Sequence, residues 1–139
     1  MKLGKNSKVD LIHHVPLFAS CTKKELAQIA SIADEIDLPE GKVLMVQGEQ
    51  GREFFVLIDG TVDVIQDDRT VKSMGPGDFF GEIALVTKVP RSATVKATSP
   101  LRALVISDRA FRALLDHSPE IQLSVLKALA ERVGQTSLP

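Results

Sequence analysis

Residues 79–95 contain chemical groups that could together bind a small anion, judged by their types and their spacing. The segment reads Phe-Phe-Gly-Glu-Ile-Ala-Leu-Val-Thr-Lys-Val-Pro-Arg-Ser-Ala-Thr-Val. Gly81 precedes the short apolar stretch 82–85, which is long enough for one helical turn. The first N–H groups of such a turn have no partner within it, and a glycine lets an anion approach the backbone closely. The segment therefore offers a place where an anion could meet backbone donors.

Three side chains of the same segment add what a phosphorylated sugar would need. Arg91 offers a planar fork of donors suited to a phosphate, and Ser92 supplies a hydroxyl. Glu82 cannot bind a phosphate itself, but its carboxylate oxygens suit a sugar hydroxyl. Together with the backbone donors, these groups describe a site for a small phosphorylated sugar.

Residue types alone leave a structural explanation open. A carboxylate in a first helical turn, such as Glu82, often only compensates the helix dipole. A glutamate and an arginine close in sequence, such as Glu82 and Arg91, usually form a salt bridge. From residue types alone, both explanations stay open: a ligand site, or a glutamate and an arginine that only stabilise the fold.

Short strands are expected around this segment. From residue 36 to residue 107, apolar pieces of four to six residues alternate with turn residues. That pattern is typical of a β-roll or a β-sandwich. Asp59-Gly60 predicts a two-residue hairpin turn, because both residues tolerate positive φ. The strands are expected at 43–46, 54–58, 62–65, 71–74, 93–97 and 101–106.

Helices are expected on both sides of the strands. Residues 9–33 are predicted to be helical, with a capping-box pattern at 22–25 followed by apolar residues at helical spacing. Residues 108–133 are predicted to form two more helices, the second starting at Pro119 and ending at Gly134. The apolar stripe of this last helix is expected to comprise Ile121, Val125, Leu126, Leu129 and Val133. The fold class is therefore α+β: an antiparallel, jelly-roll-like β-roll with an N-terminal helical segment and two C-terminal helices.

Composition narrows the function. The chain has 139 residues, 44% of them apolar, and 17 basic against 18 acidic side chains, for a net charge of -1. This balance argues against nucleic-acid binding, and no apolar run of ~18 residues predicts a membrane span or direct membrane insertion. The single cysteine, Cys21, excludes an internal disulfide and suits the cytoplasm. The three histidines form no metal-ligand pattern and no nucleophilic triad is present, so we expect one domain, 1–139, that is not an enzyme.

The order of residues in the segment resembles the phosphate-binding cassette of cyclic nucleotide-binding domains. That cassette follows approximately Phe-Gly-Glu-(Leu/Ile)-Ala-Leu, a short spacer, and Pro-Arg-(Ala/Ser/Thr)-Ala-Thr-Val, and every fixed position is present here. The resemblance extends over nearly the whole chain. Residues 15–18 are similar to the family's N-terminal helical entry, residues 39–60 to its early strands and glycines, and residues 118–120 to the start of its C-terminal lid helix.

The resemblance implies a role for each cassette residue. Arg91 is implied to pair with the cyclic phosphate, and Glu82 to accept a hydrogen bond from the ribose 2′-hydroxyl. The backbone of Gly81 would lie close to the sugar. Further phosphate contacts are implied from the N–H groups of Ile83, Ala84 and Ala93 and from the N–H or hydroxyl of Ser92.

The base subsite is implied less directly. Val64 and Val71 match positions where the family packs the base, and they are equally compatible with ordinary β-roll core. In bacterial channel domains that resemble this chain, an arginine near the end of the last helix caps the base. Arg132 is the candidate, either stacked on the base or solvated at the helix C-terminus. Ser92 stands where cGMP-favouring members often have threonine, so we expect cAMP to be favoured and cGMP to bind as well.

The implied function is a non-catalytic cytoplasmic sensor of cyclic nucleotide that needs no cofactor. Its last helix is expected to act as a lid whose position depends on the ligand. The partner would be an effector outside this chain, such as an ion channel, so the sensor could be the cytosolic part of a membrane protein. Two alternatives stay open: an interaction domain of the same fold that does not bind nucleotide, and the sensing fragment of a transcription regulator. The second is expected less, because the sequence stops soon after Val133 and its charge is balanced.

Overall fold

The structure is a computed structural model that describes residues 3–136, with side chains through Glu131. The chain divides into two compact units. Residues 33–109 form one, here called the β unit, and residues 1–32 together with 110–139 form the other, here called the helical unit.

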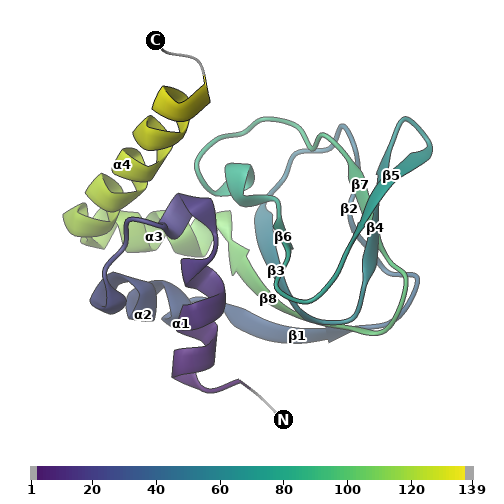
Figure 1. Cartoon of the computed structure of the whole chain (residues 1–139), viewed down its shortest axis with the longest axis horizontal. Helices are drawn as coiled ribbons and strands as arrows, with labels where there is room; N and C mark the ends of the chain where they lie inside the picture. Colours follow the sequence, from purple (N-terminus) through teal and green to yellow (C-terminus); the bar gives the residue numbers. More distant parts are fainter. Residues whose placement is uncertain (1–2, 137–139) are drawn as a thin grey trace. The chain divides into compact units, whose positions relative to one another are not determined.

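The β unit consists of two four-stranded antiparallel sheets (Figure 1). The first has the order β1-β8-β3-β6 and the second the order β2-β7-β4-β5. Their bounds are β1 Asp34–Leu38, β2 Val43–Met45, β3 Glu53–Asp59, β4 Val62–Gln66, β5 Arg69–Met74, β6 Phe79–Phe80, β7 Thr94–Ala97 and β8 Leu101–Ser107. Buried residues from both sheets form one apolar cluster, among them Leu57, Val62, Val95 and Ala103. The predicted α+β class with an antiparallel β-roll is confirmed.

Two strands and one turn differ from the sequence prediction. The strands β1 and β6 were not expected, because three of the five residues of β1 are acidic and β6 has only two residues. The predicted hairpin at Asp59-Gly60 is wrong: β3 and β4, which flank it, belong to different sheets. The two-residue hairpin turn is instead Asp67-Asp68 between β4 and β5, where both residues have positive φ, 50° and 65°. That geometry is the one that matches the twist of paired strands.

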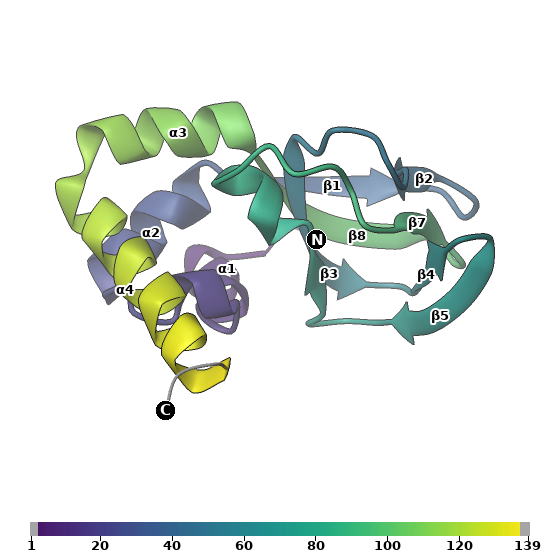
Figure 2. The ribbon, with the colours of Figure 1, turned by 90° about the horizontal axis from the view of Figure 1, so that it is seen from above.

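The helical unit contains α1 Lys5–His13, the 3₁₀ turn η1 Pro16–Phe18, α2 Lys23–Ser31, most of α3 Asp108–His117, and α4 Pro119–Thr136 (Figure 2). The capping box of α2 is formed: the Thr22 side chain accepts from the Glu25 N–H, and the Glu25 carboxylate accepts from the Thr22 N–H. The Phe18 and Phe111 rings pack with centroids 5.7 Å apart. Within the described part of the chain, no helix has the length and hydropathy that a membrane span requires.

The last helix departs from its predicted stripe in two ways. Leu126 is 62% exposed and faces solvent. The buried face of the helix is instead formed by Ile121, Val125 and Ala128. The helix also continues through Gly134 to Thr136, because a glycine costs a helix only about 1 kcal/mol and does not by itself end it.

Candidate functional site

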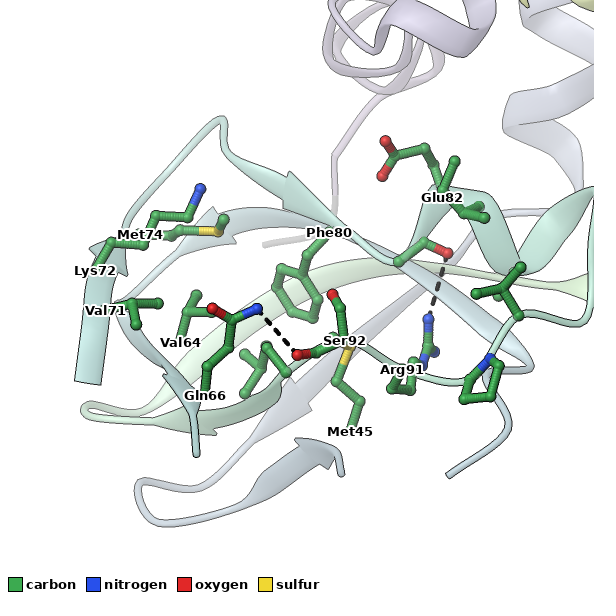
Figure 3. Close-up of a pocket in the computed structure, with 17 residues that line it drawn as sticks. Met45, Val64, Gln66, Val71, Lys72, Met74, Phe80, Glu82, Arg91 and Ser92 are labelled. Atoms are coloured by element: carbon green, nitrogen blue, oxygen red, sulfur yellow. Dashed lines mark hydrogen bonds between the residues drawn. The ribbon is translucent and has the colours of Figure 1, made fainter. Parts of the chain in front are cut away.

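A cavity of about 600 Å³ opens in the β unit (Figure 3). Its size is in the range of small-molecule sites. Every residue predicted to bind the ligand lines it except Arg132, which lies in α4 with its side chain outside the described part. The predicted residues that line it are Val64, Val71, Gly81, Glu82, Ile83, Ala84, Arg91, Ser92 and Ala93. The fold thus brings β4, β5 and the segment 79–95 to one place.

Backbone pairing fixes Arg91 at one end of this cavity. The Arg91 N–H donates to the Glu49 carbonyl and its carbonyl accepts from the Gly48 N–H, both at 2.8 Å. The guanidinium donates to two backbone carbonyls, from Nη2 to Glu53 at 2.6 Å and from Nη1 to Gly81 at 3.4 Å. A guanidinium has five N–H donors, so others stay available for a ligand. Glu82 is not among these partners.

Two glycines make the room that the arginine occupies. A Cβ at Gly51 would lie 2.5 Å from the Arg91 Cζ, and a Cβ at Gly81 would lie 2.6 Å from its Nη1. Gly81 also has a φ of +86°, which side chains rarely adopt. The resemblance implies that Gly81 lies close to the sugar; in this structure Gly81 also leaves room for the guanidinium. Gly51 was not singled out, since nothing local indicates what packs on it.

The electrostatics of this end favour an anion. Burial lowers the pKa of the Arg91 guanidinium, and the nearby Glu53 carboxylate raises it. The ordinary pKa of an arginine lies so far above neutral pH that the side chain stays charged in either case. A half-buried cation whose hydrogen-bond acceptors are neutral backbone carbonyls gains from a ligand that brings a negative charge.

The turn beside Arg91 is the 3₁₀ turn η2 Glu82–Leu85, which begins directly after Gly81. The Ala84 N–H donates within the turn to the Gly81 carbonyl at 3.1 Å. The Glu82 and Ile83 N–H groups come earlier and have no acceptor inside the turn. Glu82 is half-buried, and Figure 3 shows its carboxylate directed away from Arg91. Among the described residues the two form no ion pair, so the salt-bridge explanation does not apply to this structure.

The other end of the cavity is formed by the β4–β5 hairpin. Val64 is 7% exposed and Val71 is 52% exposed, at a point where the register of the two strands shifts. The Gln66 side chain ties this hairpin to the cassette, donating from Nε2 to the Ser92 carbonyl at 3.1 Å (Figure 3). The lining residues that were not expected from the sequence are Met45, Gln66, Lys72, Met74, Phe80, Val89, Pro90 and Val95.

The geometry separates two kinds of surface along one cavity. Arg91 and Glu82 lie toward one side, and Val64, Val71 and Met74 toward the other (Figure 3). An amphipathic anion with one negative group and one flat apolar group fits that division.

Among the described residues there is no cluster of His, Cys, Asp or Glu that could hold a metal ion. Burial and the neighbouring Glu25 raise the pKa of the Cys21 thiol to about 11, so this cysteine stays protonated at neutral pH.

A β-roll with a cavity of this kind defines a binding domain for a small anionic ligand. The family of cyclic nucleotide-binding domains matches residues 35–118, and the chain belongs to that family. The chain is 36% identical over 124 residues to a cyclic nucleotide-gated potassium channel of Rhizobium etli, covering 89% of this chain and 35% of the channel. It spans about a third of the length of the curated channel relatives it matches.

Two solved structures show the same relationship. One is the N-terminal domain of a transcriptional regulator from Streptomyces coelicolor A3(2), with a TM-score of 0.81 and 27% identity over 91% of this chain and 92% of that one. The other is the regulatory domain of Toxoplasma gondii PKA with cAMP, with a TM-score of 0.71 and 28% identity over 78% of this chain and 43% of that one. The family is one of regulatory domains and is generally non-catalytic.

Proposed function

We propose that the β-unit cavity binds a 3′,5′-cyclic nucleotide and that the domain is a non-catalytic sensor of it. The observation that carries this proposal is the Arg91 guanidinium, half-buried and hydrogen-bonded only to backbone carbonyls among the described residues, at one end of a cavity whose other end is mainly apolar. A cyclic phosphate carries one negative charge, which a single arginine can neutralise. The ribose and base then extend toward β4 and β5.

Each cassette residue has a proposed role in this complex. Arg91 donates to the phosphate, Glu82 accepts from the ribose 2′-hydroxyl, and Gly81 lies against the sugar. The Ile83 and Ala93 N–H groups and Ser92 add phosphate contacts. Ala84 contributes less than expected from the sequence if its N–H keeps its bond to the Gly81 carbonyl.

The base is proposed to pack on Val64 and Val71, with cAMP favoured and cGMP bound more weakly. Ser92 supports this order, because the resemblance associates a serine after the cassette arginine with cAMP-binding bacterial members. The structure of the T. gondii regulatory domain, which contains cAMP, supports cAMP as a ligand of this fold. Arg132 is proposed to cap the base, as the resemblance implies.

The signal is proposed to leave through α4. Within the helical unit, α4 packs on η1 and is tied to α2 by a hydrogen bond from the Ser124 hydroxyl to the Glu25 carboxylate, 2.8 Å long. Leu123 and Leu126 are 68% and 62% exposed on the same helix, so α4 has apolar surface that a second packing could cover. Bound nucleotide would favour that second packing by its higher affinity for it. Amide NMR signals of α4 should shift at saturating cAMP, and unchanged signals would reject this step.

The effector is proposed to be an ion channel, since the curated relatives include channels of which this chain covers about a third. A transcription regulator is the second candidate, supported by the likeness to the S. coelicolor domain. Reading the coding sequence on either side of this segment separates the two: membrane spans support the channel, and a helix-turn-helix supports the regulator.

Isothermal titration calorimetry tests the binding proposal. We expect one site per chain for cAMP and weaker binding of cGMP, with the nucleotides recovered unchanged by chromatography. 5′-AMP, which carries a second negative charge and lacks the ring formed by the cyclic phosphate, is the control and should bind far more weakly. Absence of heat with both cyclic nucleotides at millimolar concentration would reject the proposal and favour an interaction domain.

A further inference from the structure

Three lysines from two helices face one hollow in the helical unit. The helices α1 and α2 pack against each other, and a hollow of about 510 Å³ lies where their N-terminal parts meet. Lys5 of α1 and Lys23 and Lys24 of α2 line it, and all three side chains are exposed. Asp10 is the single acidic residue of the lining, and within the described part of the chain no ion pair joins it to these lysines. The three lysines, here called the lysine face, therefore concentrate positive charge in one place.

The ends of the two helices add to this charge. The N-terminus of a helix carries about half a positive charge, which acidic residues in the first turn usually offset. The helix α1 has no acidic residue in its first turn, and its cap residue makes no side-chain hydrogen bond. The helix α2 begins with Lys23 and Lys24, and the first-turn carboxylate of Glu25 is buried and accepts hydrogen bonds from the cap of α2 and from α4. Both helix ends therefore favour an anion from outside.

The lysine face is the positive part of a chain whose charge is unevenly divided. Residues 3–32 contain four lysines, no arginine and two acidic residues, one of which is the buried Glu25. Residues 33–109 contain nine basic and thirteen acidic residues. The net charge of -1 for the whole chain therefore combines a positive N-terminal segment with a negative β unit. A negatively charged partner is attracted to the segment that carries α1 and α2.

The make-up of the lysine face favours a surface of mobile anionic groups over a protein partner. Protein interfaces usually bury an apolar core. None of the large apolar side chains that are exposed in the described part of the chain lies in α1 or α2. A lysine is a point charge on a flexible stem, whereas carboxylates at fixed positions are matched best by the planar fork of an arginine. The phosphate groups of a lipid bilayer are negative, densely spaced and mobile, so lysines suit them.

We propose that the lysine face is a docking surface for an anionic membrane, where it contacts the phosphate groups of the lipids. The contact is peripheral, since the described part of the chain has no helix suited to span a membrane and α1 and α2 expose no large apolar side chain. The inference goes beyond the proposed function, because it needs no bound nucleotide. A channel effector, as proposed above, would keep the domain close to such a surface.

Vesicle co-sedimentation of the whole chain tests this inference. At about 50 mM salt the chain should bind vesicles of phosphatidylcholine with about 30% phosphatidylglycerol and should not bind phosphatidylcholine alone. At about 500 mM salt the binding should be lost, because salt screens exposed charges. The double variant Lys23→Gln/Lys24→Gln should bind the anionic vesicles at least about twentyfold more weakly, and Lys5→Gln about fivefold more weakly. Calorimetry should give both variants the cAMP affinity of the wild type.

The double variant Lys42→Gln/Lys96→Gln is the matched control, since it removes two exposed lysines of the β unit that do not line the hollow. It should bind the vesicles as the wild type does. Unchanged vesicle binding in Lys23→Gln/Lys24→Gln overturns the inference, and so does an equal loss in the control, which would reflect net charge alone. Binding of a poly-glutamate peptide or of duplex DNA without binding of anionic vesicles also overturns it. Each of these results leaves the proposed function standing, because nucleotide binding is measured separately.

Discussion

The two ends of the cavity are built in different ways. At the cassette end, Arg91 is held by backbone hydrogen bonds to the segment 48–49, by side-chain bonds to two carbonyls, and by space left at two glycines. At the hairpin end, Val71 and Lys72 lie on an exposed edge strand, and one side-chain bond, from Gln66, ties the hairpin to the cassette. One end is fixed by main-chain geometry, whereas the other is formed mainly by side chains.

This difference indicates which property each end controls. Phosphate recognition needs hydrogen-bond donors at defined positions. It therefore depends on backbone pairing and on two glycines whose replacement would displace the Arg91 guanidinium. Base recognition needs a surface and one or two edge contacts, which single substitutions on an edge strand can change. We therefore expect changes at the cassette end to weaken binding of every cyclic nucleotide strongly and changes at the hairpin end to have smaller effects.

The largest effect is expected for Arg91→Ala. Loss of a charged hydrogen-bonding partner of the phosphate should weaken binding of cAMP and cGMP alike by about 2–3 kcal/mol or more. Calorimetry measures both, with Arg112→Ala as a control because Arg112 is an exposed arginine of α3. If Arg91→Ala retained wild-type affinity, the contrast between the two ends would be lost.

The next largest effect is expected for Gly51→Ala. The new Cβ would lie 2.5 Å from the Arg91 Cζ, so the guanidinium must move. We expect about tenfold weaker binding of both nucleotides, together with a loss of about 1–3 kcal/mol in unfolding free energy. Gly75→Ala is the matched control, since a Cβ there meets nothing within 4 Å. Equal behaviour of the two variants in calorimetry and urea denaturation would show that Arg91 tolerates displacement.

A smaller effect is expected for Val71→Ala at the hairpin end. Its side chain is half exposed without ligand, and removing two methyl groups takes away roughly 1 kcal/mol or less of apolar contact with the base. Both affinities should fall by about threefold and their ratio should hold, as measured by competition binding. Val43→Ala, 42% exposed and outside the cavity, should have no effect. A loss as large as that of Arg91→Ala would contradict the division of roles.

The smallest effect is expected for Asp68→Gly in the β4–β5 turn. Asp68 has a φ of 65°, which glycine adopts at lower cost. Unfolding free energy should rise by about 0.5 kcal/mol in urea denaturation, while nucleotide affinity stays unchanged. A change in affinity would mean that the hairpin's position, and not only its side chains, sets the binding strength.

The cassette could be predicted because its residues are contiguous, so their order alone identifies them. The hairpin end could not, since Lys72 and Met74 reach the cavity only through the register of β5 on β4. Gly51 was missed for the same reason: its contact with Arg91 joins segments about 40 residues apart in sequence. The turn at Asp59-Gly60 has hairpin composition but links two sheets, because local preference does not specify which strand pairs with which. Leu126 was misplaced because a helix with apolar residues on several sides does not reveal its buried face.

The central claim is that Arg91 recognises the phosphate of a cyclic nucleotide. It is tested most directly by competition binding of cAMP and of adenosine, which lacks the phosphate, to wild type and Arg91→Ala. We predict that the wild type prefers cAMP by at least about a hundredfold, and that the preference falls by at least about tenfold in Arg91→Ala. The same preference in both proteins would contradict the account.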